Sequence, residues 1–221
     1  MSSSATRISP AAPETARILN LAPLLAATPR EDPYPWAVAA GCVAAAALPA
    51  LRRDFPRIDR PGYHPVEQLE PRGSFAALLA EIEAGALDDA MTRLFGPDFA
   101  ALPRLVTVQR LSAREAGRPH TDSARKAATL LLYLNPAWAS SEGCIRVLRS
   151  EDLADVVAEW PPVEGHVFAF LRGPDSWHGH TPFVGERRVV QVAWLRDRAA
   201  LAAKQRQHRF TWWLKGVFRR H

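Results

Sequence analysis

Two short segments contain the residue types that bind metal ions. The first is the H-x-D pattern of His120 and Asp122, and the second is the W-H-G-H run at 177–180. Residues i and i+2 of a strand point to the same side, so His120 and Asp122 can face one site together. H-x-D alone is common in surface turns. A distant histidine would complete a facial set of two imidazoles and one carboxylate, which is typical of non-haem Fe(II) sites. We therefore predict that His120, Asp122 and one histidine of the W-H-G-H run, His178 or His180, bind a metal ion.

Short apolar runs surround these residues and must position them. Many short strands with Gly and Pro turns are typical of a sandwich or barrel, and the lack of β-α-β alternation disfavours a doubly wound sheet. The Pro-rich stretch 56–71, which contains His64, and residues 152–159 are expected to lie outside the strands. We expect strands at 36–43, 105–111, 127–134, 144–148, 165–171, 176–180 and 187–195, and helices at 16–25, 44–54, 74–84 and 87–95.

Four blocks of sequence carry a family resemblance. They are GRPHTDSARKAATLLLYLNPAW at 117–138, GCIRVL at 143–148, GHVFAF at 165–170 and SWHGHTPFVGERRVVQVAW at 176–194. In this order the blocks resemble the 2-oxoglutarate/Fe(II)-dependent oxygenases, in particular their prolyl 4-hydroxylase-like branch. Many relatives have Gly-Gly where this chain has Gly143-Cys144, a difference that does not affect the metal ligands.

The resemblance implies a mainly β fold with flanking α-helices, a double-stranded β-helix or jelly roll. The oxygenase domain is expected at 34–196. It follows a partly disordered N-terminal extension at 1–33 and precedes a basic amphipathic C-terminal helix at 197–221.

The resemblance also implies a chemistry. Fe(II) would be held by His120, Asp122 and His178, and 2-oxoglutarate would be the cosubstrate, with ascorbate as a further candidate cofactor. With O2 the enzyme would hydroxylate an unidentified substrate and release succinate and CO2. His178 is preferred to His180 because it follows Ser-Trp, as in the family motif, and stands ten residues before Arg188. His180 is expected beside the ligands or facing the substrate.

The distal carboxylate of 2-oxoglutarate requires a buried cation, and two adjacent arginines are available. Arg187 and Arg188 point to opposite faces of a strand. Because the family places a tryptophan on the cosubstrate face, and Arg188 shares a face with Trp194, we predict that Arg188 binds the carboxylate. Arg187 remains the alternative.

Three residues near the H-x-D pattern are further candidates for the cosubstrate pocket. Tyr133 matches a tyrosine that hydrogen-bonds the same carboxylate in related hydroxylases, although a core aromatic is an equal alternative. Thr129 lies on the same strand face as Tyr133 and is predicted to line the pocket. Lys126 is the weakest candidate, and a solvated bend is the expected place for it.

The composition fits one globular domain in a reducing compartment. The chain has 221 residues, 48% of them hydrophobic, and its two cysteines, Cys42 and Cys144, show no zinc-finger spacing. We expect both cysteines to be free and buried. The N-terminus lacks the apolar run of a signal peptide, so a cytoplasmic location is predicted.

The positive charge is concentrated at the C-terminus. Residues 196–221 hold eight Lys or Arg and one acid, whereas the rest of the chain holds 20 basic and 22 acidic residues, so no nucleic-acid partner is expected. The tail is predicted to be a helix docked on the core, with peripheral membrane contact as the less favoured alternative. Its apolar stripe consists of Phe210, Trp213, Leu214, Val217 and Phe218.

Two other functions compete with the hydroxylase. One is a jelly-roll binding module that has lost turnover, and the other is a cupin-type metal enzyme that uses no 2-oxoglutarate. The complete metal-ligand set argues against the first. A buried arginine directed at the metal pocket would argue against the second.

Overall fold

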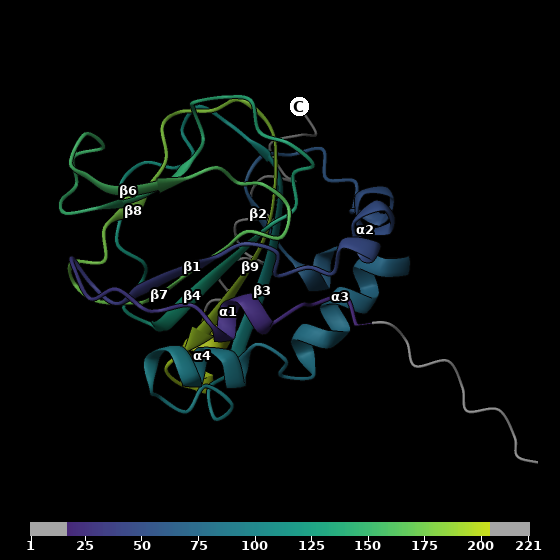
Figure 1. Cartoon of the computed structure of the whole chain (residues 1–221), viewed down its shortest axis with the longest axis horizontal. Coiled ribbons are helices and arrows are strands. Elements are labelled where there is room, and N and C mark those ends of the chain that lie inside the picture. The colour runs from purple at the N-terminus through teal and green to yellow at the C-terminus, as the bar shows by residue number, and fades with distance from the viewer. Residues whose placement is uncertain (1–16, 204–221) are drawn as a thin grey trace, which may run out of the picture.

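The computed structural model describes residues 17–203. Two antiparallel sheets face each other, a six-stranded sheet in the order β1-β7-β4-β9-β3-β2 and a three-stranded sheet in the order β6-β5-β8. The helices lie against the larger sheet, on the side away from the smaller one (Figure 1). The strands are β1 Trp36–Ala39, β2 Tyr63–Pro65, β3 Arg104–Ser112, β4 Lys126–Tyr133, β5 Ile145–Leu148, β6 Val156–Trp160, β7 Val167–Leu171, β8 His178–Gly179 and β9 Gly185–Leu195.

Three of the predicted helices, at 44–54, 74–84 and 87–95, lie close to the observed ones, whereas the helix predicted at 16–25 is reduced to the single turn Ala22–Leu25. In α3 the residues at helical spacing, Phe75, Leu78, Leu79 and Ile82, are all buried, as their pattern predicts. Pro49 stands in the first turn of α2, where no backbone N–H is required. The α-helices are α1 Ala22–Leu25, α2 Leu48–Asp54, α3 Gly73–Glu83 and α4 Asp88–Phe95, with short 3₁₀ turns at Ala45–Ala47 and Val66–Gln68.

The central strands β4 and β9 are buried on both faces, which explains their nearly continuous apolar sequence. One face packs on the helices through Leu130, Leu132 and Trp194. The other face, which includes Leu131 and Tyr133, turns toward the smaller sheet. The mainly β fold with flanking helices is therefore confirmed, and the space between the two sheets is where a site can form.

Two edge strands were not expected. The Pro-rich connection contains β2, which pairs with β3, and the presumed surface excursion contains β6, which pairs with β5. Pro65 is tolerated because an edge strand need not donate every backbone hydrogen bond. The half-exposed pattern of β6 gives little hydrophobic periodicity from which to predict it.

Residues next to the described termini pack on this fold. The backbone N–H groups of Ile18 and Leu19 donate to the Glu81 carboxylate, and both residues belong to the core. A helical turn starts at Arg198 and places Ala200 beside Leu195. The first 16 residues of the extension predicted to be partly disordered, and the apolar stripe of the tail, lie outside the described residues, so these predictions and the domain boundaries stay predictions. Within 17–203 no helix is long and apolar enough to span a membrane. Cys42 and Cys144 are free and buried, as predicted.

Candidate metal and cosubstrate site

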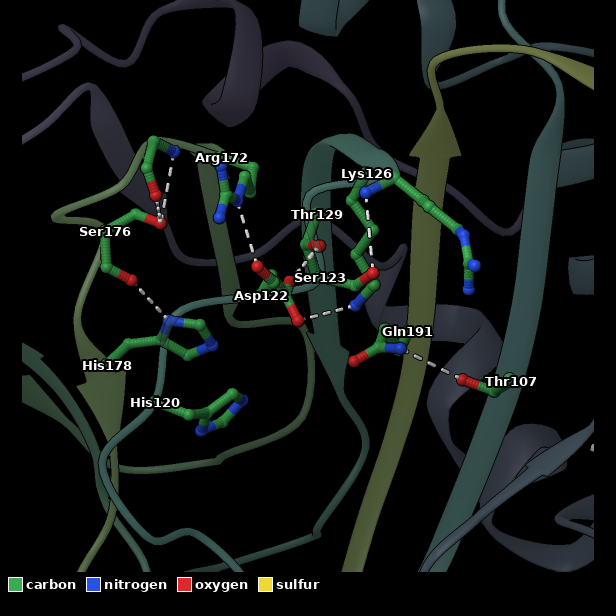
Figure 2. Close-up of polar contacts among 12 residues, drawn as sticks. Thr107, His120, Asp122, Ser123, Lys126, Thr129, Arg172, Ser176, His178 and Gln191 are labelled. Atoms are coloured by element: carbon green, nitrogen blue, oxygen red, sulfur yellow. Dashed lines mark hydrogen bonds and ion pairs between the residues drawn. The ribbon is translucent and has the colours of Figure 1, made fainter. Parts of the chain in front are cut away.

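The three predicted ligands meet at one point between the sheets. His120 and His178 form an antiparallel bridge in which each backbone N–H donates to the other's carbonyl, at 3.0 and 3.1 Å. One ligand atom from each of His120, Asp122 and His178 lies within 4.8 Å of the others. Strand pairing thus brings together two motifs that are far apart in sequence, and Figure 2 shows the three side chains side by side.

Backbone carbonyls fix the orientation of both imidazoles. Nδ1 of His178 lies 2.9 Å from the carbonyl of Ser176, and Nδ1 of His120 lies 2.8 Å from that of Arg118. A carbonyl only accepts, so Nδ1 carries the proton in each ring and Nε2 keeps its lone pair. The ring of Phe170 packs against His178 with the centroids 4.5 Å apart. Each Nε2 is therefore prepared to bind a metal ion.

The protonation states suit a divalent cation. Burial, reinforced by repulsion from His120, lowers the pKa of His178 to about 4. Burial alone would raise the pKa of Asp122, but the Lys126 ammonium, His178 and two hydrogen bonds outweigh burial and lower that pKa to about 2. At neutral pH the site offers a neutral imidazole and a carboxylate, which is the donor chemistry that Fe(II) requires.

Both oxygens of the Asp122 carboxylate have a donor. Lys126 Nζ lies 2.8 Å from Oδ1, and Thr129 Oγ1 donates to Oδ2 at 2.6 Å (Figure 2). The expectation of a solvated bend for Lys126 is wrong, because its side chain is buried. Thr129 lines the cavity as predicted, and it also orients the metal-binding carboxylate, a contact that the sequence did not suggest.

A narrow cavity of about 80 Å³ extends from the metal ligands into the space between the sheets. Arg187 and Gln109 line it, and so do Tyr63 and Gln191. Tyr63 lies in the unexpected strand β2 and left no signal in the sequence. Gln109 and Gln191 interrupt apolar strands, and such polar residues in otherwise buried strands could have indicated the cavity.

The structure corrects the choice between the two arginines. Arg187 is 1% exposed and lines the cavity. Arg188 lies on the opposite face of β9, where its guanidinium pairs with Glu186 and covers the ring of Phe55. The error came from Trp194, which faces the helices and donates to Asp88 instead of facing the cavity.

Two polar atoms in this part of the site have no partner among the described residues. They are Nη2 of Arg187 and the Tyr133 hydroxyl, both buried. The other guanidinium nitrogens are held, Nε by the Gly143 carbonyl at 3.0 Å and Nη1 by Gln109 at 3.4 Å. Burial raises the pKa of Tyr133, so its hydroxyl stays protonated as a donor. The remaining donors, Nη2 of Arg187 and the Tyr133 hydroxyl, are suited to binding an anionic group such as a carboxylate.

His180 lines the same cavity as the metal-binding histidines and Arg187. Its Nδ1 is 2.8 Å from the Thr181 carbonyl, and burial lowers its pKa to about 4. His180 is outside the group whose ligand atoms converge, which agrees with the choice of His178. His64 lies away from this cavity, with its Nε2 at 3.1 Å from the Arg60 carbonyl.

Known oxygenases are similar to this chain in sequence and in fold. Residues 106–196 match the family model of the 2OG-Fe(II) oxygenase superfamily. A Pseudomonas putida prolyl-4-hydroxylase structure is 22% identical with a TM-score of 0.50, over 73% of this chain and 92% of that one. A Phytophthora capsici prolyl 4-hydroxylase structure is 20% identical with a TM-score of 0.50, over 72% of this chain and 58% of that one. No curated protein sequence matches significantly.

The class defined by the fold is the double-stranded β-helix of the prolyl 4-hydroxylase type, as predicted. Residues 106–196, a little over two fifths of the chain, are similar to the 2OG-Fe(II) oxygenase superfamily. Together with the convergence of His120, Asp122 and His178, this match supports the predicted enzyme class, a dioxygenase that uses Fe(II) and 2-oxoglutarate.

Proposed function

We propose that this enzyme hydroxylates a still unidentified substrate, with release of succinate and CO2, and that its cavity holds 2-oxoglutarate between the metal and Arg187. When bound, Fe(II) and 2-oxoglutarate supply the oxidative chemistry that consumes O2. The observation that carries the proposal is Arg187, which lines the same cavity as His120 and His178 and whose buried Nη2 has no partner among the described residues. The ring of Tyr133, whose buried hydroxyl also has no partner there, lies behind this lining with its centroid 5.3 Å from the guanidinium carbon.

Each residue has a defined task in this proposal. Nε2 of His120 and of His178 and one oxygen of Asp122 would hold the metal. Arg187 and Tyr133 would bind the distal carboxylate of 2-oxoglutarate by charge-assisted hydrogen bonds. Gln109 holds the guanidinium in place, and Thr129 holds the Asp122 carboxylate. The cavity is small, so it suits a short dicarboxylate better than a large substrate, which would approach from the side of the exposed His120.

The alternatives are less well supported. A cupin-type enzyme without 2-oxoglutarate has no use for a buried cation directed at the metal cavity. A silent binding module has no need of two imidazoles oriented through Nδ1 and an ionised carboxylate held at both oxygens.

The test is anaerobic binding followed by turnover. Fe(II) and 2-oxoglutarate added together without O2 should give the weak visible charge-transfer band expected of this family, and His120→Ala and Asp122→Ala should abolish it. Aerobic turnover of 2-oxoglutarate to succinate, with ascorbate present, then allows candidate substrates to be screened, beginning with prolyl peptides because the compared structures are prolyl hydroxylases. A band that persists in both variants would refute the ligand set, and succinate that never rises with any substrate would favour the binding module.

A further inference from the structure

Lys126 reaches the metal site through an irregularity of strand β4. Lys126 pairs with Leu195 and Ala128 pairs with Trp194, so one extra residue, Ala127, is inserted at this point. Without the insertion, alternation would place Lys126 on the helix side with Ala128. A bulge of this kind redirects a side chain and is common beside active sites. Here the bulge brings Lys126 to the same face as Thr129.

The Lys126 ammonium is buried against a metal ligand. The side chains of Lys126 and Asp122 are 8% and 10% exposed, and the ammonium lies 2.8 Å from Oδ1. The carbonyl of Asp122 accepts a hydrogen bond from Nε of Arg172 at 2.9 Å, which holds the backbone of the same residue. A buried lysine is costly unless it is paired, so the pair with Asp122 is a built feature of the site.

We propose that Lys126 is a positioning residue that shares the Asp122 carboxylate with the bound metal, holding the carboxylate in place while weakening the affinity for divalent cations. The inference rests on the metal site of the proposed function. It adds that the affinity of this site is set partly by a resident cation beside one of its ligands.

The physical argument compares the two donors to the carboxylate. A carboxylate has about four lone-pair positions, so Lys126 and Thr129 leave one on each oxygen for a metal ion. Two cations that share one buried carboxylate repel each other, and burial limits screening by water and salt. Thr129 is neutral and orients the carboxylate without repulsion. Removing Lys126 and removing Thr129 should therefore change metal affinity in opposite directions.

The experiment is a titration of chelator-treated protein with Mn(II), with free Mn(II) measured by electron paramagnetic resonance. Lys126→Met should bind Mn(II) roughly tenfold tighter than the wild type or more, because the repulsion is lost and Thr129 still holds the carboxylate. Lys126→Arg should stay close to the wild type. Thr129→Val should bind several-fold more weakly. Arg125→Gln, which removes an exposed cation one residue away, is the matched control and should leave the affinity unchanged.

A second readout separates this role from a merely structural one. In chelator, Lys126→Met should melt roughly 5–15 °C below the wild type, because Asp122 loses its buried partner. Saturating Mn(II) should raise its Tm by more than it raises that of the wild type, since a ligand that binds the folded state more tightly stabilises it more. A structural residue would lower both the Tm and the affinity.

The outcomes are distinguishable. If folded Lys126→Met binds Mn(II) no more tightly than the wild type, the inference is wrong although the proposed function can stand. If the wild type itself binds no divalent metal, the proposed function fails at its first step.

Discussion

At the scale of the residue, Arg187 and Arg188 form a natural pair of test and control. Arg187→Ala should weaken 2-oxoglutarate binding by roughly 2–5 kcal/mol, the usual cost of removing one member of a buried charge pair. Arg188→Ala should change the binding little, because its guanidinium lies on the other face of β9 beside Glu186. Anaerobic calorimetry with Mn(II)-loaded protein measures both affinities. The reverse ranking would show that the distal carboxylate lies elsewhere.

The role of the Tyr133 hydroxyl can be tested by Tyr133→Phe, which removes only the phenolic oxygen. Tyr133→Phe should weaken 2-oxoglutarate binding by about 1.5–3 kcal/mol, the range for a hydrogen bond to a charged group. The same variant should lose no stability without cosubstrate, because the hydroxyl has no partner among the described residues. The affinity comes from calorimetry and the stability from urea unfolding. A stable variant with unchanged affinity would mean that Tyr133 is only a core aromatic.

The residues show what sequence reasoning can and cannot supply. The i, i+2 spacing of His120 and Asp122 suggested that they act together, and they do converge, although His120 forms only an isolated bridge and Asp122 lies before β4 instead of in a strand. His178 could be chosen from its motif. Alternation along β9 shows that Arg188, and not Arg187, shares a face with Trp194. It does not show which of the two faces is turned toward the cavity, because that depends on what covers each face. The sequence does not state that helices cover the Trp194 side. The contact of Lys126 with Asp122 depends on one inserted residue, which no hydrophobic pattern reveals.

At the scale of the element, the segment before His120 needs a glycine. Gly117 has φ of +77°, and a Cβ there would lie 2.3 Å from the ring of His180. Gly117→Ala should therefore cost backbone strain and also displace His180 from the cavity wall. We expect a loss of about 2–4 kcal/mol in the free energy of unfolding, together with weaker 2-oxoglutarate binding.

Gly96 provides the control for this change. Its φ is +92°, and no atom lies within 4 Å of the Cβ that would be added. Gly96→Ala thus measures backbone strain without the steric contact, and urea unfolding of both variants gives the difference. If the two variants lose the same stability and bind 2-oxoglutarate equally well, the packing of His180 on Gly117 has no role in the site.

The helices and strands were predicted correctly where apolar residues recur at the spacing of a buried helix or strand face. Helix α3 buries one face, at helical spacing, and strands β4, β7 and β9 bury most of their side chains, so their apolar patterns were sufficient. Strands β2 and β6 are held by backbone pairing at sheet edges. That pairing depends on the partner strand and not on the local sequence, so it could not be read from their side chains.

At the scale of the molecule, a buried carboxylate joins the helices to the large sheet. Asp88, in the first turn of α4, accepts a hydrogen bond from Trp194 Nε1 at 2.8 Å and pairs with Arg104. Both partners come from the large sheet, Trp194 from β9 and Arg104 from the start of β3. This carboxylate is therefore a buried polar link between the helical layer and the sheet that carries the site.

Asp88→Ala should destabilise the whole domain by roughly 3–5 kcal/mol, because it leaves the Arg104 guanidinium and the Trp194 indole without their buried partner. Asp89→Ala is the matched control, since Asp89 stands in the same first turn but is exposed. Its loss should be limited to about 0.3–1 kcal/mol, the contribution of a carboxylate near a helix N-terminus. Urea unfolding followed by fluorescence measures both variants. Equal losses at the two positions would show that the carboxylate acts only on the helix end, and that the contacts with β3 and β9 do not stabilise the attachment of α4 to the sheet.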